Sequence, residues 1–475
     1  MASEIRVNKI ENRSGLGTVT FADTGVDLAG IVTATTFSGS GASLTNLPAS
    51  NLTGSLPAIS GANLTGIAAT DNVRTGILDV AGIATFRNDV NIGAAVTISE
   101  SGIEASGIGI TCANINGGAI GGRRNLIING DFRIAQRSTS ASTTDGYATV
   151  DRFRVNSAGT DEAPTQAQVD VASGTTPYTE GFRKAYKITN GNQSGGAGSS
   201  DGIFLNYTIE AQDLANSGWN YTSSSSFITL SFWVKSSVAQ TFYGRLESVD
   251  GSVYNYPYSY AVSANTWTKV VKTIPGNSNL QIDNNNGSGM EFHWDTFRGS
   301  NFSDSGVALD TWAAYASGTR TPSQTSTWWT TNDATWELTG VQVEVGSQAT
   351  AFEHRSYGEE LELCKRYYQQ INGDTGDYTG FSAYSESTTS VRIPVQLHPA
   401  MRAAFANSKS GIFRFQGATN DSDDSAYSFS IEGVNTNFNA CTIRNTNYAN
   451  MGAADRPGNL QFRSDGASLK FDAEL

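Results

Sequence analysis

The feature that most constrains this chain is the absence of large aromatic side chains from its first quarter. Residues 1–122 contain no Trp and no Tyr, and their only Phe residues are Phe21, Phe37 and Phe86. All eight Trp residues lie between Trp219 and Trp336. A segment of small side chains cannot close a thick core alone, yet its apolar residues recur too regularly for a solvated linker. We therefore expect these residues to be buried against copies of the same chain.

The same segment repeats itself imperfectly. GASLTNL at 41–47 returns as GANLTGI at 61–67, and AGIVT at 29–33 returns as AGIAT at 81–85. Small repeated β units leave an apolar face that only a neighbour can cover. Three such faces meeting on one axis would form a core and would pair the free strand edges. The sequence thus predicts a homotrimeric shaft over 41–122, preceded by an attachment segment over 1–40.

Composition and charge exclude several classes of protein. Charged residues are 16% of the chain and Gly supplies 50 positions, which favours short strands and turns, and therefore an all-β fold. The net charge is -13, and no cluster of Lys and Arg is present, which argues against a nucleic-acid partner. The charged start MASEIRVNKIE is unlike a signal peptide, and no apolar run is long enough for a membrane helix. We expect synthesis in a cytoplasm without membrane insertion.

From Arg123 onwards the composition is that of a globular domain, and alternating apolar residues predict a β-sandwich of jelly-roll type over 123–355. Long loops are expected between Ile274 and Thr335. Trp336 and Leu338 alternate with polar residues at even positions. Val341, Val343 and Val345 alternate with polar residues at odd positions. A β-bulge is therefore expected at Gly340, where the alternation changes. The expected strands are 125–130, 182–190, 227–237, 241–248, 265–275 and 334–346.

A helix is predicted next, over 356–371. Ser356 and Glu359 have the capping-box spacing, and acidic residues fill its first turns. This helix would link the sandwich to a distal β-domain, or tip, over 372–475. The strands expected there are 391–397, 411–417, 426–433 and 467–475.

Several segments, taken in order, resemble tail-fibre and receptor-binding proteins of tailed phages, particularly those that infect cyanobacteria. They are SEIRVNKIEN at 3–12, the shaft repeats, NLIINGDFRIAQR at 125–137 followed by VDRFR at 150–154, and the block 341–369. Within them, NLIINGDF, LSFWVKSS and VQVEVG resemble the β-sandwich of carbohydrate-binding modules. The resemblance thins after Ile371.

This resemblance implies an elongated homotrimeric fibre in the virion. Its N-terminal end would dock on a phage tail or baseplate protein, and its distal end would meet a glycan of the host surface. Members of the sandwich family often hold a structural calcium through an acidic pair and carry a Glu at the position of Arg133. Because this chain has Arg133 and VQVEV instead, we expect no metal at that position.

Candidate sugar contacts combine an aromatic side chain with nearby hydrogen-bonding groups. One is Trp294 with Asp295 and Arg298, and a second is the pair Trp328 and Trp329 in a Ser/Thr-rich loop. A third group lies in a loop expected near the tip. Its members are Tyr378, Phe381 and Tyr384.

Two further patterns have structural interpretations. Tyr254, Tyr256, Tyr258 and Tyr260 alternate along one strand, so we expect that face in the sandwich core or a subunit interface. The acidic run 421–424 lacks the spacing of an EF-hand, so a solvated loop is favoured over a Ca²⁺ site. The three Cys residues are far apart and have no metal-ligand spacing. We expect neither cofactor nor metal.

No arrangement of residues predicts catalysis. Glu291 and Asp295 flank Trp294, and glycosidases need two carboxylates. Acidic residues beside Gly- and Asn-rich loops are, however, usually solvated or bonded to turn amides. We therefore expect a non-enzymatic tail fibre that recognises the host surface and adheres to it by binding surface polysaccharide. A polysaccharide-degrading tailspike hydrolase and a purely structural fibre connector remain the alternatives.

Overall fold

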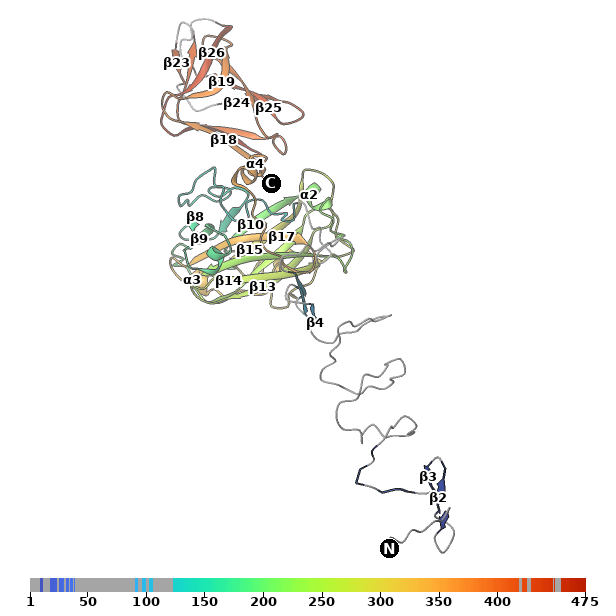
Figure 1. Ribbon diagram of the computed structural model, residues 1–475. Helices are drawn as coiled ribbons and strands as arrows, with labels where there is room; N and C mark the ends of the chain where they lie inside the picture. Colours follow the sequence, from blue (N-terminus) through green and yellow to red (C-terminus); the bar gives the residue numbers. More distant parts are fainter. Residues whose placement is uncertain are drawn as a thin grey trace. The chain divides into compact units, whose positions relative to one another are not determined.

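The computed structural model divides into two units, residues 1–107 and 108–475 (Figure 1). It describes 123–417 without a gap. The other described residues are 9–11, 18–23, 25–29, 31–33, 35–36, 38, 90–92, 96–99, 102–105, 421–424, 429–446, 448 and 454–475.

The described parts of the first unit include short antiparallel strands in two three-stranded sheets. The first sheet contains β1 (Lys9–Glu11), β2 (Thr18–Ala22) and β3 (Gly25–Ala29), and the second contains β4 (Val90–Ile92), β5 (Val96–Ser99) and β6 (Gly102–Ala105). Val26 and Leu28 of β3 are exposed in the single chain. The repeats at 41–47 and 61–67 lie outside the described residues, so the expected shaft stays a prediction.

The second unit begins with a β-sandwich. Its six-stranded sheet has the order β16-β13-β12-β15-β10-β7, and its five-stranded sheet the order β14-β11-β17-β9-β8. The first sheet contains β7 (Arg154–Ala158), β10 (Gly202–Glu210), β12 (Gln240–Ser248), β13 (Tyr254–Val262), β15 (Ser288–Arg298) and β16 (Ala313–Ala314). The second contains β8 (Thr165–Asp170), β9 (Lys184–Thr189), β11 (Phe227–Ser236), β14 (Thr268–Pro275) and β17 (Thr335–Val345).

Most expected strands of the sandwich are confirmed, with two corrections. The segment 125–130 forms no strand, although the Leu126 amide donates to the Val343 carbonyl at 2.9 Å. The region between Ile274 and Thr335 is not only loop, because β15 lies there and pairs with both β10 and β12. Short helical turns complete the sandwich: α1 (Thr176–Thr179), α2 (Ala211–Ala215), the 3-10 turn η3 (Ser317–Thr319) and α3 (Thr327–Thr330).

Aromatic side chains fill the space between the two sheets. Tyr256, Tyr258 and Tyr260 of β13 are all buried in this core, which confirms the core interpretation of the alternating tyrosines. The bulge at Gly340 is also confirmed. Register shifts between Ser231 and Trp233 on β11, and Gly340 has a φ of +66°. A left-handed backbone costs Gly little, so the residue fits the bulge.

The linking helix α4 (Tyr357–Lys365) begins where the sequence predicts but ends earlier. The Ser356 side chain accepts a hydrogen bond from the Glu359 amide at 3.2 Å, which is half of the expected capping box. Tyr368 belongs to the next strand instead of the helix. None of the helices in the described parts of the chain is long and apolar enough to cross a bilayer.

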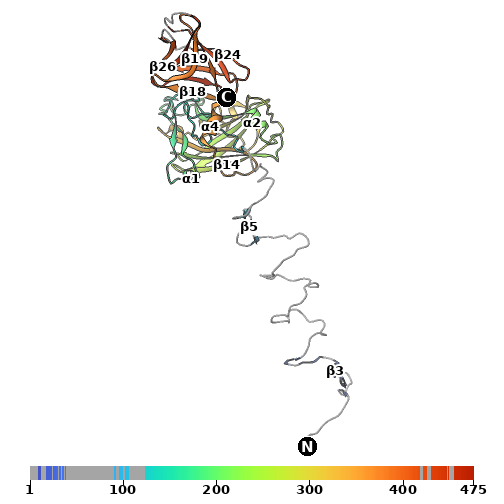
Figure 2. The same cartoon turned by 45° about the horizontal axis from the view of Figure 1, so that its top comes forward.

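The C-terminal domain, residues 368–475, is a second sandwich. A three-stranded sheet has the order β18-β27-β21, and a seven-stranded sheet the order β23-β22-β26-β19-β20-β25-β24. In both views β18 lies between α4 and the seven-stranded sheet (Figure 1 and Figure 2). The strands are β18 (Tyr368–Gly373), β19 (Tyr378–Ser385), β20 (Val391–Gln396), β21 (Ala406–Ser410), β22 (Phe413–Gly417), β23 (Asp421–Asp423), β24 (Ser430–Val434), β25 (Ala440–Asn445), β26 (Arg456–Phe462) and β27 (Ala467–Asp472).

Candidate functional site

One face of the seven-stranded sheet is exposed, and we call it the open face. On β19, Ser382 and Tyr384 are exposed whereas the alternate residues Ala383 and Ser385 are buried. The segment 378–385, expected as a loop, is therefore a strand with one solvent-exposed face. The open face is defined by Tyr378, Ser382, Tyr384, Gln416, Pro457, Asn459 and Gln461.

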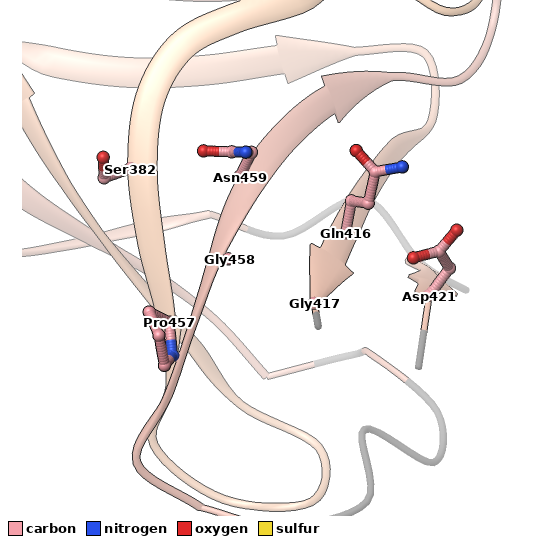
Figure 3. A pocket seen from close by; sticks show the side chains of 7 residues that line it. All are labelled: Ser382, Gln416, Gly417, Asp421, Pro457, Gly458 and Asn459. Carbon is pink, nitrogen blue, oxygen red and sulfur yellow. The ribbon is translucent and has the colours of Figure 1, made fainter. Parts of the chain in front are cut away.

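A pocket of 480 Å³ lies on the open face. Gln416, Asn459 and Ser382 stand opposite one another on the neighbouring strands β22, β26 and β19. Figure 3 shows these side chains along the strands that border the pocket, with Asp421 at one end. Because amide and hydroxyl groups both donate and accept, this row suits a ligand rich in hydroxyls.

A second pocket of 270 Å³ adjoins the first through the shared residue Asn459. Its lining includes Tyr378 and Phe381, two of the residues expected to contact sugar. Tyr378 is 55% exposed, and its hydroxyl donates to Gln416 Oε1 at 2.5 Å. Phe381 is half-buried and packs against the domain core.

The third expected residue of this group, Tyr384, also lies on the open face. The residue is 36% exposed, and it stands opposite Pro457, which lines the larger pocket. The structure thus gathers Tyr378, Phe381 and Tyr384 on one strand beside two adjoining pockets. An exposed aromatic ring next to amide groups is the arrangement that the flat C–H faces and the hydroxyls of a sugar require.

Charges near the open face are compensated by close partners. Arg414 Nε lies 2.6 Å from Asp423 Oδ1, and Arg414 Nη1 lies 3.5 Å from Asp421. The hydrogen bond from Arg414 lowers the pKa of Asp423, so this carboxylate stays ionised and paired. The groups left for a ligand are mainly the neutral amides and hydroxyls.

The aromatic residues expected in the first sandwich do not form exposed platforms. Trp294, Trp328 and Trp329 are all fully buried. Trp294 points from β15 into the core between the sheets. Trp328 and Trp329 lie in the helical turn α3, and their indole N–H groups donate to backbone carbonyls at 3.2 and 2.6 Å. These three residues therefore pack inside the first sandwich and present no exposed ring to a ligand.

Asp295 and Arg298 are buried as well, on the sheet face opposite Trp294. Their side chains form an ion pair at 3.0 Å, and the Arg298 guanidinium stacks 3.6 Å above the Phe204 ring. Burial acts to raise the pKa of Asp295, but the charges of Arg298 and Arg245 outweigh it, and the pKa is lowered. Neither residue accompanies an exposed Trp.

Sequence reasoning missed a polar cluster on this same sheet face, formed by Asn206, Arg245, Glu247, Glu291 and His293. His293 Nε2 lies 3.1 Å from Glu291 Oε2 and 3.8 Å from Glu247 Oε2. Burial, followed by the charge of Arg245, lowers the pKa of His293 well below its usual range. The alternation of Glu291, His293 and Asp295 along MEFHWDTF was the available signal for this cluster.

The described parts of the two sandwiches hold no evident metal centre. Over the described ranges, no group of three or more His, Cys, Asp or Glu residues has the arrangement of a metal site. Cys364 and Cys441 are buried free thiols, and Cys112 lies outside the described residues.

No protein-family model matches the chain, and no curated protein matches its sequence. Solved structures do match. The enzymatically active domain of tailspike protein 4 from bacteriophage CBA120 is 10% identical, with a TM-score of 0.25, over 46% of this chain and 21% of that one. The N-terminal cellulose-binding domain of Cellulomonas fimi β-1,4-glucanase C is 12% identical, with a TM-score of 0.22, over 45% and 97%.

A family 11 carbohydrate-binding module from Clostridium thermocellum, in complex with a β-1,3-1,4-mixed-linked tetrasaccharide, also matches. It is 12% identical, with a TM-score of 0.21, over 46% of this chain and 99% of that one. This chain spans about a fifth of the tailspike domain's length. At these TM-scores the similarities assign neither a function nor a ligand, and the two sandwiches are established by their own sheet order.

Proposed function

We propose that this chain is a phage tail-fibre protein that adheres to the host cell by binding surface polysaccharide on the open face. The observation that carries the proposal is the exposure of Tyr378 and Tyr384 beside pockets lined by Ser382, Gln416 and Asn459. Rings of this kind stack on sugar C–H faces, while amides bond the hydroxyls. Shallow pockets of this kind bind weakly, and repetition over three subunits and several fibres would supply avidity.

The remaining parts of the proposal come from the N-terminal repeats and from the sequence resemblance. The N-terminal segment would attach to a tail or baseplate protein, residues 41–122 would form the trimeric shaft, and the protein would reside in the virion. Charge does not favour simple electrostatic attraction, because both the chain and bacterial envelopes are acidic. Specificity would come from shape and hydrogen bonding.

The test is a binding assay of the purified full-length protein on an array of bacterial surface polysaccharides. Tyr378→Ala and Asn459→Ala should each weaken binding about tenfold, since a hot-spot contact is worth more than about 1 kcal/mol. Tyr357→Ala is the matched control, because Tyr357 is 59% exposed but lies on α4. Equal loss in all three variants would contradict the open face as the site, and no binding to any glycan would favour a structural connector.

A second candidate function, polysaccharide hydrolysis, is favoured by one observation. Glu247 and Glu291 stand opposite each other on β12 and β15, and both reach toward His293 Nε2. Their Oε2 atoms are therefore no more than about 7 Å apart, and glycosidases use two carboxylates about 5 to 10 Å apart. Release of new reducing ends from polysaccharide, lost in Glu247→Gln and Glu291→Gln but not in Tyr378→Ala, would establish this activity in place of simple adhesion.

A further inference from the structure

A buried lysine lies inside the C-terminal domain. Lys409 is on β21, and its side chain is only 2% exposed. Its Nζ atom lies 5.5 Å from the centre of the Phe413 ring and 5.1 Å from that of Phe429. A lysine enclosed by aromatic rings is uncommon, because desolvating an ammonium group is costly unless it is paired.

The group facing Lys409 is the carboxylate of Asp424, whose side chain is 1% exposed. Asp424 Oδ1 accepts a hydrogen bond from the Phe413 amide at 2.9 Å, which fixes the orientation of the carboxylate. Oδ2 contacts Lys409 Nζ and also accepts a hydrogen bond from Asn445 Nδ2 at 3.2 Å. One oxygen atom therefore touches two nitrogens, an amine and a carboxamide, in an enclosed site. The expectation of a solvated loop at 421–424 is wrong for Asp424.

We propose that Lys409 and Asn445 form an intramolecular isopeptide bond, with Asp424 as the proton carrier. Lys409 Nζ attacks Asn445 Cγ, so a C–N bond forms while the bond from Cγ to Nδ2 breaks. One proton leaves Nζ, passes through Asp424 Oδ2 and reaches Nδ2, which departs as ammonia. The reaction exchanges one amide for another and needs no oxidant, metal or cofactor.

The surroundings supply what this reaction requires. The attacking amine must be neutral, and burial lowers the pKa of Lys409 to about 8. A carboxylate in contact with both nitrogens can take the proton from the nucleophile and give it to the leaving group. Folding itself holds the two reactants together, which replaces a bimolecular encounter with an intramolecular one.

The bond would join the two sheets of the C-terminal domain. Lys409 belongs to the three-stranded sheet through β21, and Asn445 to the seven-stranded sheet through β25. A covalent bridge between sheets reduces the conformational entropy of the unfolded chain, and so stabilises the fold, as a disulfide does. It would suit a domain exposed to mechanical load, and it is independent of glycan binding at the open face.

The experiment is the intact mass of the purified full-length protein under denaturing conditions. We expect a mass below that of the sequence by one ammonia, and a branched tryptic peptide that joins the segment around Lys409 to the segment around Asn445. Lys409→Arg and Asp424→Asn should both restore the full mass. Lys470→Arg, in the adjacent strand β27, is the matched control and should keep the ammonia loss.

A wild-type mass equal to that of the sequence would overturn the proposal without any variant having to fold. Loss of one water in place of ammonia, with a branch at residue 424, would overturn Asn445 as the acceptor. Ammonia loss that persists in Lys409→Arg would also overturn it, because the loss would then arise at another amide.

Discussion

The ring of Trp294 meets that of Phe232 edge-on across the first sandwich, with the centroids 6.0 Å apart and the planes at 89°. Trp294 projects from β15 of the six-stranded sheet, and Phe232 from β11 of the five-stranded sheet. The residue first expected to stack on a sugar therefore holds the two sheets together.

Trp294→Ala should lower the free energy of unfolding by about 3–5 kcal/mol, because it removes a large buried side chain and leaves a cavity. A urea titration followed by fluorescence measures the change. Glycan binding by the molecules that remain folded should be unaffected. A variant of unchanged stability that loses glycan binding would contradict the packing role.

The sequence predicts best those strands in which apolar residues alternate regularly along one face. The ranges 227–237 and 334–346 were predicted in this way, and the alternating apolar residues of β11 and β17 are buried between the sheets. The sequence did not predict β15. Glu291, His293 and Asp295 occupy its outer face, and polar residues beside Gly- and Asn-rich segments suggest a loop. Polar and apolar residues do alternate along β15, but the sequence alone does not show that its polar face is buried.

The candidate site could be predicted only in part. Tyr378, Phe381 and Tyr384 were singled out as aromatic residues of an expected loop, and they lie together because that segment is a strand. Trp328 and Trp329 were expected in a Ser/Thr-rich loop. The helical turn α3 lets both be buried. The Asp424 contacts depend on strands far apart in sequence, which no local pattern indicates.

Gly340→Ala should destabilise the first sandwich. The φ of +66° is strained for any residue with a Cβ, and a Cβ there would lie 2.6 Å from the Phe182 ring. We expect a loss of about 1–3 kcal/mol in the free energy of unfolding, measured by urea titration. Gly358→Ala is the control, since nothing lies within 4 Å of a Cβ at that helical position. Equal effects from both substitutions would contradict the bulge as the cause.

Glu474→Gln should loosen the contact between the two sandwiches. Glu474 forms an ion pair with Arg152, which is fully buried and stacks 3.4 Å above the Tyr367 ring. Removing one partner of a buried pair leaves an uncompensated charge and costs about 3–5 kcal/mol. Thermal unfolding followed by circular dichroism measures the loss. Asp170→Asn is the control, because that carboxylate is 81% exposed and its pair with Lys184 should matter little.

Asp151 should make the stability of the chain depend on pH. Burial raises its pKa to about 6, against the opposing charge of Arg137, whose Nη1 lies 3.6 Å away. In the unfolded chain an Asp titrates near about pH 3.9, so between these values the folded state holds a proton that the unfolded state has released. The stabilising contribution of Asp151 is therefore complete below the unfolded pKa and is lost as the pH rises through the folded pKa.

Asp151→Asn removes this titration while keeping a hydrogen-bonding side chain of the same size. The free energy of unfolding should be measured for wild type and variant across the range from about pH 4 to about pH 7, where a shift of this size is worth on the order of 3 kcal/mol. The difference between the two proteins should move in favour of the variant as the pH rises, because only the wild type must then bury a carboxylate. A difference that stays constant across the range would show that Asp151 is ionised throughout and that Arg137 compensates it fully.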